Sequence, residues 1–152
     1  DDLRWLRACI WPEMPGRIER FDAAVEHLRS DPPELVRADM VDGLAQVITT
    51  HRTPGSHLVV FSSWALTYVA RERRTGIADV LADAAADGPV SWVTAEPPGC
   101  VPGLPEQGPT DDAADRLTGT VVGARRWRDG AELPAQVWGS VHGHGNWIDF
   151  RP

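Results

Sequence analysis

The sequence predicts an α/β domain with a mainly parallel sheet, helices on both faces, and an antiparallel hairpin at the carboxyl end. Two short apolar runs, SHLVVF and PVSWVTAEP, are typical of strands that are buried on both faces. Amphipathic helical segments separate the strands, and crossover helices between buried strands imply parallel pairing. The last part of the chain alternates around an Asp-Gly pair at 129–130, which predicts a hairpin.

Residues 1–34 are expected to form a helical lead-in. Apolar residues recur at helical spacing in residues 2–10, and Pro12 ends this pattern. The segment GRIERFDAAVEHLRS, residues 16–30, carries a second apolar stripe and predicts a second helix.

Residues 35–96 are expected to hold the α/β core. ELVRADM predicts a short strand whose end carries Asp39, and VDGLAQVITTH predicts the helix after it. SHLVVF is the next strand, and residues 62–88 then predict a turn and a long helix that Gly76 divides. PVSWVTAEP follows as another buried strand, with Glu96 at its carboxyl end.

The rest of the chain divides into a loop and a tail. Residues 97–118 are rich in proline, glycine and acidic residues, which predicts a loop. Residues 119–152 predict the hairpin GTVVGARRW and AELPAQVWGSVHGHG and a short last piece, NWIDF. Alternation in this hairpin places Arg125 and Trp127 on one face.

Composition excludes several classes of function. A chain of 152 residues with 42% hydrophobic content is expected to be one soluble, cytoplasmic domain. The net charge of −7 argues against nucleic acid or an anionic membrane as a partner. No apolar run reaches membrane-spanning length and no secretory leader is visible. Cys9 and Cys100 are expected to be free thiols, with a single disulfide as the alternative.

Ser62 and Ser63 are the first candidate ligand-binding residues. They follow a predicted buried strand at the carboxyl edge of the sheet, where folds of this kind bind ligands. Two hydroxyls and the free amides of the next helix would cradle an anion such as sulfate or carboxylate. The alternative is an ordinary serine N-cap. Trp64 and Tyr68 would line the same pocket or belong to the core.

Glu96, His142 and His144 are the candidate catalytic residues. A carboxylate at the strand end of Glu96 would accept a proton from an amine, or form a salt bridge to an arginine. The two histidines are two residues apart, so on a strand they share a face. They would act as a base or hydrogen-bond donor, or support a strand bent at glycines. Two ligands do not make a metal site, so no metal is expected.

Four segments resemble the carboxyl-terminal half of an uncharacterised bacterial family, domain of unknown function 2332: RWLRACIWPE, VVFSSWALTYV, WVTAEP and HGHGNW. VRADM, HLVVFSSWALTYV and VSWVTAEP also resemble the third, fourth and fifth strands of a Rossmann-like methyltransferase, in which an acid such as Asp39 neighbours adenine. The chain departs from the family pattern, because Ser62-Ser63 stands where a His-Ser pair is usual. Chemistry that needs that histidine is therefore in doubt.

This resemblance implies a gap in the sheet. In the methyltransferase fold, strands one and two lie between strands three and four, and the chain has no counterpart of them and no glycine-rich first turn. The predicted strands at 35–38 and 58–61 would then lack a neighbour, which is costly and prone to aggregation. A larger protein subunit, or the missing part of a longer chain, is expected to supply the strands. No cofactor is expected.

The split architecture resembles two-subunit enzymes of antibiotic biosynthesis that form aziridine rings, of the azinomycin and vazabitide type. This resemblance implies a small subunit that acts on a small-molecule or carrier-bound substrate, in which an amine displaces sulfate. Glu96 or the histidine pair would then serve the amine, and the turn at Ser62–Ser63 or an arginine would serve the sulfate. Two alternatives stay open: a fragment of an S-adenosylmethionine-dependent methyltransferase, and a non-catalytic, chaperone-like subunit that stabilises its partner.

Overall fold

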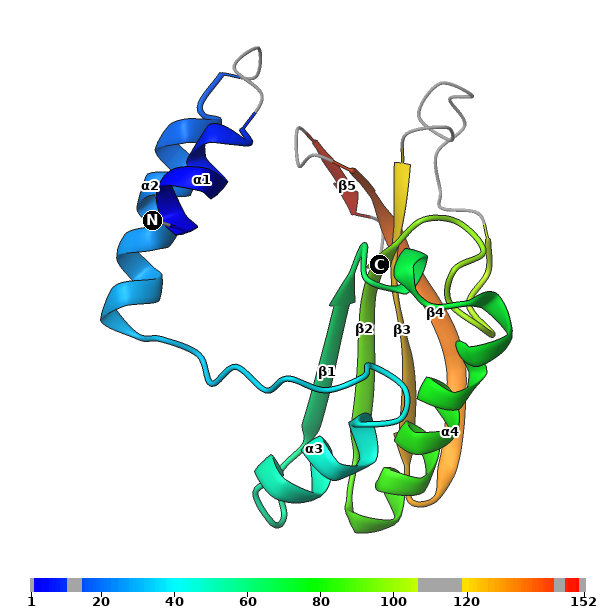
Figure 1. The fold of residues 1–152 in the computed structure, drawn as a ribbon. Helices are drawn as coiled ribbons and strands as arrows, with labels where there is room; N and C mark the ends of the chain where they lie inside the picture. The colour runs from blue at the N-terminus through cyan, green and yellow to red at the C-terminus, as the bar shows by residue number, and fades with distance from the viewer. Residues whose placement is uncertain (1, 11–14, 107–118, 144–146, 151–152) are drawn as a thin grey trace. The chain divides into compact units, whose positions relative to one another are not determined.

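The structure is a computed structural model that describes residues 2–10, 15–106, 119–143 and 147–150. Residues 1–37 and 38–152 form two compact units (Figure 1). In the part of the chain that the structure describes, no helix is long and apolar enough to cross a membrane. Cys9 and Cys100 are free thiols, as expected.

The first unit contains the two helices that the sequence predicts. Helix α1 spans Asp2–Ala8 and helix α2 spans Arg17–Ser30. The guanidinium of Arg7 on α1 donates two hydrogen bonds to the carboxylate of Asp22 on α2, at 3.1 and 3.2 Å. No residue of α1 or α2 is buried.

The second unit is built on an open five-stranded sheet with the strand order β1-β2-β3-β4-β5. The strands are β1 (Leu58–Ser63), β2 (Val90–Glu96), β3 (Gly119–Arg128), β4 (Ala131–His142) and β5 (Ile148–Phe150). Strands β1 and β2 are parallel, and the other three neighbouring pairs are antiparallel. The prediction of a mainly parallel sheet is therefore wrong.

The predicted strand at 35–38 accounts for this difference. Residues 32–39 adopt no regular secondary structure and are exposed. A strand forms only where another strand accepts its hydrogen bonds, and this segment pairs with none of the described strands. The one parallel pair is then outnumbered by the antiparallel strands of the tail.

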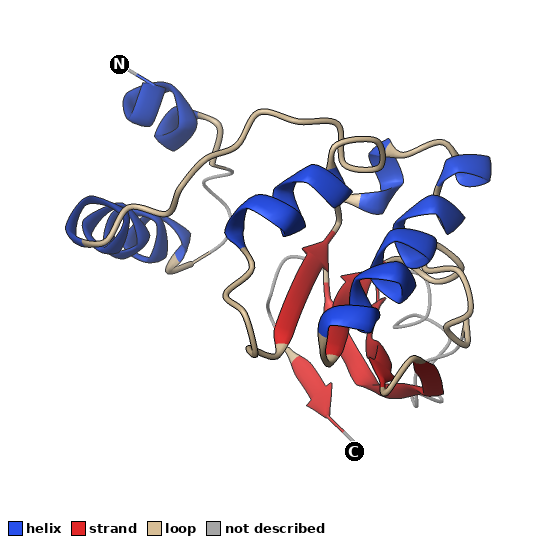
Figure 2. Cartoon of the chain, turned by 90° about the horizontal axis from the view of Figure 1, so that it is seen from below, coloured by secondary structure: helices blue, strands red, loops and turns tan. Residues whose placement is uncertain are grey.

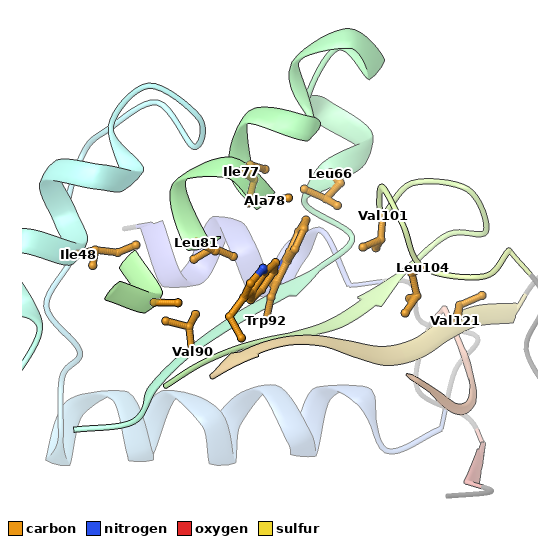
Figure 3. Close-up of a cluster of buried hydrophobic side chains, with 12 residues drawn as sticks. Ile48, Leu66, Ile77, Ala78, Leu81, Val90, Trp92, Val101, Leu104 and Val121 are labelled. Carbon is orange, nitrogen blue, oxygen red and sulfur yellow. The ribbon is translucent and has the colours of Figure 1, made fainter. Parts of the chain in front are cut away.

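The hydrophobic core lies on one face of the sheet, which we call the helix face. Helix α3 (Leu44–His51) and helix α4 (Thr75–Ala84) cover this face (Figure 2). Ile48, Ile77 and Leu81 from these helices pack against Val90 and Trp92 of β2 (Figure 3). Val90 and Trp92 are both fully buried, which confirms β2 as a buried strand.

The opposite face, which we call the open face, carries the alternate residues of each strand. Val59 and Phe61 of β1 lie on it and are 58% and 65% exposed. The prediction that β1 is buried on both faces is therefore wrong for the described residues. Helices α3 and α4 both pack on the helix face, and β1 is an edge strand.

The long helix expected after β1 is divided, but not at Gly76. Three-residue 3₁₀ turns, η1 (Leu66–Tyr68) and η2 (Arg71–Arg73), precede α4, and η3 (Ala85–Asp87) follows it. Gly76 lies in the first turn of α4, so the division lies upstream of it. Leu66 and Val69 are buried there, at 0% and 8% exposure, and anchor the irregular segment to the core.

The predicted hairpin is confirmed. Asp129 and Gly130 join β3 to β4 with φ values of 53° and 73°. Positive φ at both turn residues matches the right-handed twist of the paired strands, and Asp-Gly tolerates it. The last short piece of the tail contains strand β5, which pairs antiparallel with the end of β4.

Candidate functional site

The carboxyl ends of β1 and β2 bring three predicted site residues to one edge of the sheet. Ser62 pairs with Thr94 and Ser63 with Ala95, so Glu96 follows directly at the end of β2. This is the edge at which α/β folds usually bind ligands. The expected neighbourhood of Ser62, Ser63 and Glu96 is therefore present.

Glu96 is fully buried, at 0% exposure, on the helix face. Its Oε1 accepts a hydrogen bond from the Ala65 amide at 3.1 Å, and its Oε2 accepts one from the Leu66 amide at 3.3 Å. Burial raises the pKa of Glu96, while hydrogen bonds from Ala65, Ser62 and Leu66 and the charge of Arg74 act in the opposite direction and only reduce the rise. Glu96 thus fastens the end of β2 to the turn that leaves β1.

The turn after β1 differs from the anion cradle that the sequence suggested. The amides of Ala65 and Leu66 donate to Glu96. The turn leads into η1, which has three residues, rather than into a long helix. The Ser62 hydroxyl accepts a hydrogen bond from Trp92 Nε1 at 3.2 Å, whereas Ser63 is exposed. A ligand-binding role for Ser62 and Ser63 stays a prediction.

Trp64 occupies the tightest point of this turn. Its φ of 51° lies in the left-handed region, which is rare for an aromatic residue and costs about 1–3 kcal/mol. Its amide donates to the Ala95 carbonyl at 3.2 Å, and its indole Nε1 donates to Thr120 Oγ1 at 2.9 Å. These two bonds hold the conformation, with the Trp64 side chain 44% exposed. Tyr68, one turn on, is 90% exposed.

Asp39 lies in a turn before α3, not at the end of a strand. Its Oδ1 accepts the amides of Val41 at 2.8 Å and Asp42 at 3.0 Å, and Arg73 Nη2 lies 2.9 Å from the same oxygen. Backbone hydrogen bonds, first from Asp42 and then from Val41, and the side-chain bond from Arg73 lower the pKa of Asp39 to about 2. The adenine-side position suggested for Asp39 therefore lacks its strand.

His142 lies at the end of β4, at the same edge of the sheet as the end of β2. His142 pairs with Gly119 of β3. Two residues further along β3, Val121 pairs with Glu96, so His142 and Glu96 lie near the same end of β3. The His142 amide donates to the Trp147 carbonyl at 3.0 Å, and the two rings meet edge to face at 6.0 Å. His144 lies outside the described residues. Among the described residues, no group of three or more His, Cys, Asp or Glu side chains could hold a metal ion.

A groove of about 520 Å³ lies between α3 and α4, away from all of these residues. The residues that line it include Ile48, Gly55, Val80 and Asp87. Since Gly55 precedes β1 and Asp87 precedes β2, the groove lies toward the amino ends of these strands. It contains none of the residues that the sequence singled out.

A polar cluster of Arg126, Ser91 and His57 lies on the open face, and the sequence motifs did not identify it as a site. Arg125 and Trp127 share the helix face as expected, with the guanidinium 5.1 Å from the indole centroid. Arg126 therefore points to the open face, directly opposite Ser91. The Ser91 hydroxyl lies 2.9 Å from His57 Nε2. Alternation in the segment ARRW was the signal that could have identified Arg126.

The chain matches a model of a known protein family. A family model described as "Uncharacterized protein conserved in bacteria (DUF2332)" matches residues 1–150. Comparisons with curated proteins and with solved structures give no match.

Proposed function

The chain belongs to the DUF2332 family, and from this premise we propose that it completes the sheet of a larger α/β enzyme by pairing with a partner polypeptide along β1. More specifically, we propose that β1 and β2 correspond to the fourth and fifth strands of a methyltransferase-type sheet. The partner would supply the strands that lie next to β1 in that fold.

The observation that carries this proposal is the outer edge of β1. The amides of Leu58 and Trp64 donate toward β2, to the carbonyls of Pro89 and Ala95. Backbone groups alternate along a strand, so the N–H and C=O groups of residues 59, 61 and 63 point to the outer edge. That edge pairs with no strand in the part of the chain that the structure describes.

The side chains of β1 give this edge no protection. Soluble proteins commonly guard an edge strand with lysine, proline, an inward charge or a bulge. β1 reads LVVFSS, which contains none of these residues, and its pairing with β2 is regular along its whole length. An apolar edge of this kind is a template for another strand.

We propose that the assembled enzyme catalyses the closure of an aziridine ring. A substrate amine forms a bond to a neighbouring carbon, and the bond from that carbon to the sulfate oxygen breaks, so that sulfate leaves with the bonding electrons. The proton of the resulting aziridinium passes to a base, for which His142 is this chain's candidate. Support comes from the resemblance to two-subunit aziridine-forming enzymes. Glu96 would position the turn after β1, because its buried carboxylate holds two backbone amides. Ser63 and His142 are then this chain's candidates for contact with the substrate.

Substitution at the β1 edge tests the assembly. We expect the chain alone to self-associate in size-exclusion chromatography with light scattering, and Val59→Lys to prevent this. Ile148→Lys is the matched control, because Ile148 is similarly exposed, at 65%, on the opposite edge strand, and should leave self-association unchanged. A monodisperse wild-type monomer with cooperative unfolding would contradict the proposal.

A non-catalytic, stabilising subunit is the second candidate, because Glu96 is occupied by internal hydrogen bonds. In the assembled enzyme, Ser63→Ala or His142→Ala should lower turnover of an amino-sulfate substrate at least tenfold if this chain contributes to the site. Unchanged turnover in both variants would favour the stabilising role. Tight binding of S-adenosylmethionine to the assembly would favour a methyltransferase instead.

A further inference from the structure

Arg126 on the open face is a cation without a carboxylate partner among the described residues. Its Nη2 donates to Gln136 Oε1 at 2.8 Å, but its Nε is buried and has no hydrogen-bond partner there. The neighbouring Arg125, on the helix face, is neutralised by Glu132 through two bonds of 2.7 and 2.9 Å. Of these two neighbouring arginines, only Arg125 is paired with a carboxylate among the described residues.

The open face has no acidic residue at its described strand positions, and beyond the polar cluster of Arg126, Ser91 and His57 it carries exposed apolar side chains. Val59 and Phe61 are exposed at one side of the sheet, and Ile148 and Phe150 are exposed at the other, at 65% and 54%. Exposed large apolar side chains that gather on one face of a sheet are typical of an interaction surface. A guanidinium inside such a surface selects for a partner with negative charge.

The charge of Arg126 and the exposed apolar side chains together favour one kind of binding partner for the open face over two others. A second copy of the chain, packed with the same face, would bring Arg126 against a surface that has no acidic residue. A small anion would leave Val59 and Phe61 exposed to water. A helix with an apolar stripe and one carboxylate would cover both features.

We propose that the open face docks an amphipathic helix of the partner polypeptide, and that an aspartate or glutamate on this helix pairs with Arg126. The inference extends the proposed function, since the partner is the polypeptide that joins the sheet at β1. It adds a second contact surface and the charge that the partner must present there.

The absence of lysine from the chain permits a direct test. A carbodiimide joins an amine to a carboxylate in contact with it, without a spacer. In R126K the new amine is the only lysine amine of the chain, so a cross-link at this position identifies the facing carboxylate. The tagged full chain would be isolated together with its partner from the bacterium that produces both, cross-linked, and mapped by mass spectrometry.

We expect a cross-link from position 126 to an aspartate or glutamate of the partner. R73K is the positive control, because Arg73 lies 2.9 Å from Asp39 and 3.0 Å from Asp42 and should cross-link within the chain. R126E should weaken the complex at least about thirtyfold, because it places two like charges in one buried contact, whereas R128E, at the exposed end of β3, should not.

Three results would overturn the inference. They are a cross-link from position 126 to another residue of this chain, a cross-link to a second copy of it, and no cross-link while R73K reacts. An assembled complex with any of these results overturns the inference alone. A tagged chain that copurifies with no partner overturns the proposed function as well.

Discussion

Removal of the Glu96 carboxylate should destabilise the second unit strongly. Glu96 is fully buried and satisfies two backbone amides that would otherwise lack an acceptor. Each buried unsatisfied donor costs about 1–3 kcal/mol, so Glu96→Ala should lower the free energy of unfolding by about 4 kcal/mol. Glu96→Gln keeps one acceptor oxygen and should cost about 2 kcal/mol. Urea denaturation at pH 7, followed by tryptophan fluorescence, measures both values.

A comparison of the wild type with Glu96→Gln at two pH values tests the protonation of Glu96. Burial raises the pKa of Glu96 in the folded chain, so above about pH 4.3, the ordinary value for glutamate, the folded state binds a proton that the unfolded state releases. The contribution of Glu96 to stability therefore falls as pH rises through this window. The wild type should exceed Glu96→Gln in stability by more at pH 4.5 than at pH 7. A pH-independent difference, or Glu96→Ala within 1 kcal/mol of wild type, would refute the argument.

Three further substitutions probe the rest of the second unit. Arg125→Ala should lower the free energy of unfolding by about 2 kcal/mol, because it breaks a bidentate pair with Glu132 and a 2.8 Å hydrogen bond to the Pro102 carbonyl. A double-mutant cycle with Glu132→Ala should therefore assign only part of this loss to the pair. Gly139→Ala should detach β5, because an added Cβ would overlap the Asp149 carbonyl oxygen. We expect the free energy of unfolding to fall by about 3 kcal/mol and amide hydrogen exchange to become faster in β5 alone. Unchanged exchange in β5 would contradict this expectation. Asp39→Asn should remove a contribution to stability that is present above about pH 4 and is lost as pH falls toward 2, so the variant should show less acid destabilisation than the wild type in that range.

Local sequence patterns determined most of the secondary structure. The apolar stripe of α2, the runs that form β1 and β2, and the Asp-Gly turn all depend on residues within a few positions of one another. The position of Ser62, Ser63 and Glu96 at one edge also followed from the sequence, since the carboxyl ends of parallel strands meet there. Alternation placed Arg125 and Trp127 together for the same reason.

Tertiary structure decided the features that depend on distant partners. The segment 35–38 has the composition of a strand, but a strand forms only where another strand accepts its hydrogen bonds. The apolar run of β1 could not reveal that one of its faces is exposed, because burial depends on what packs against it. Glu96 holds amides about thirty positions earlier in the chain. Periodicity reports which residues share a face, whereas pairing, burial and charge neutralisation are set by neighbours that only the folded chain brings together.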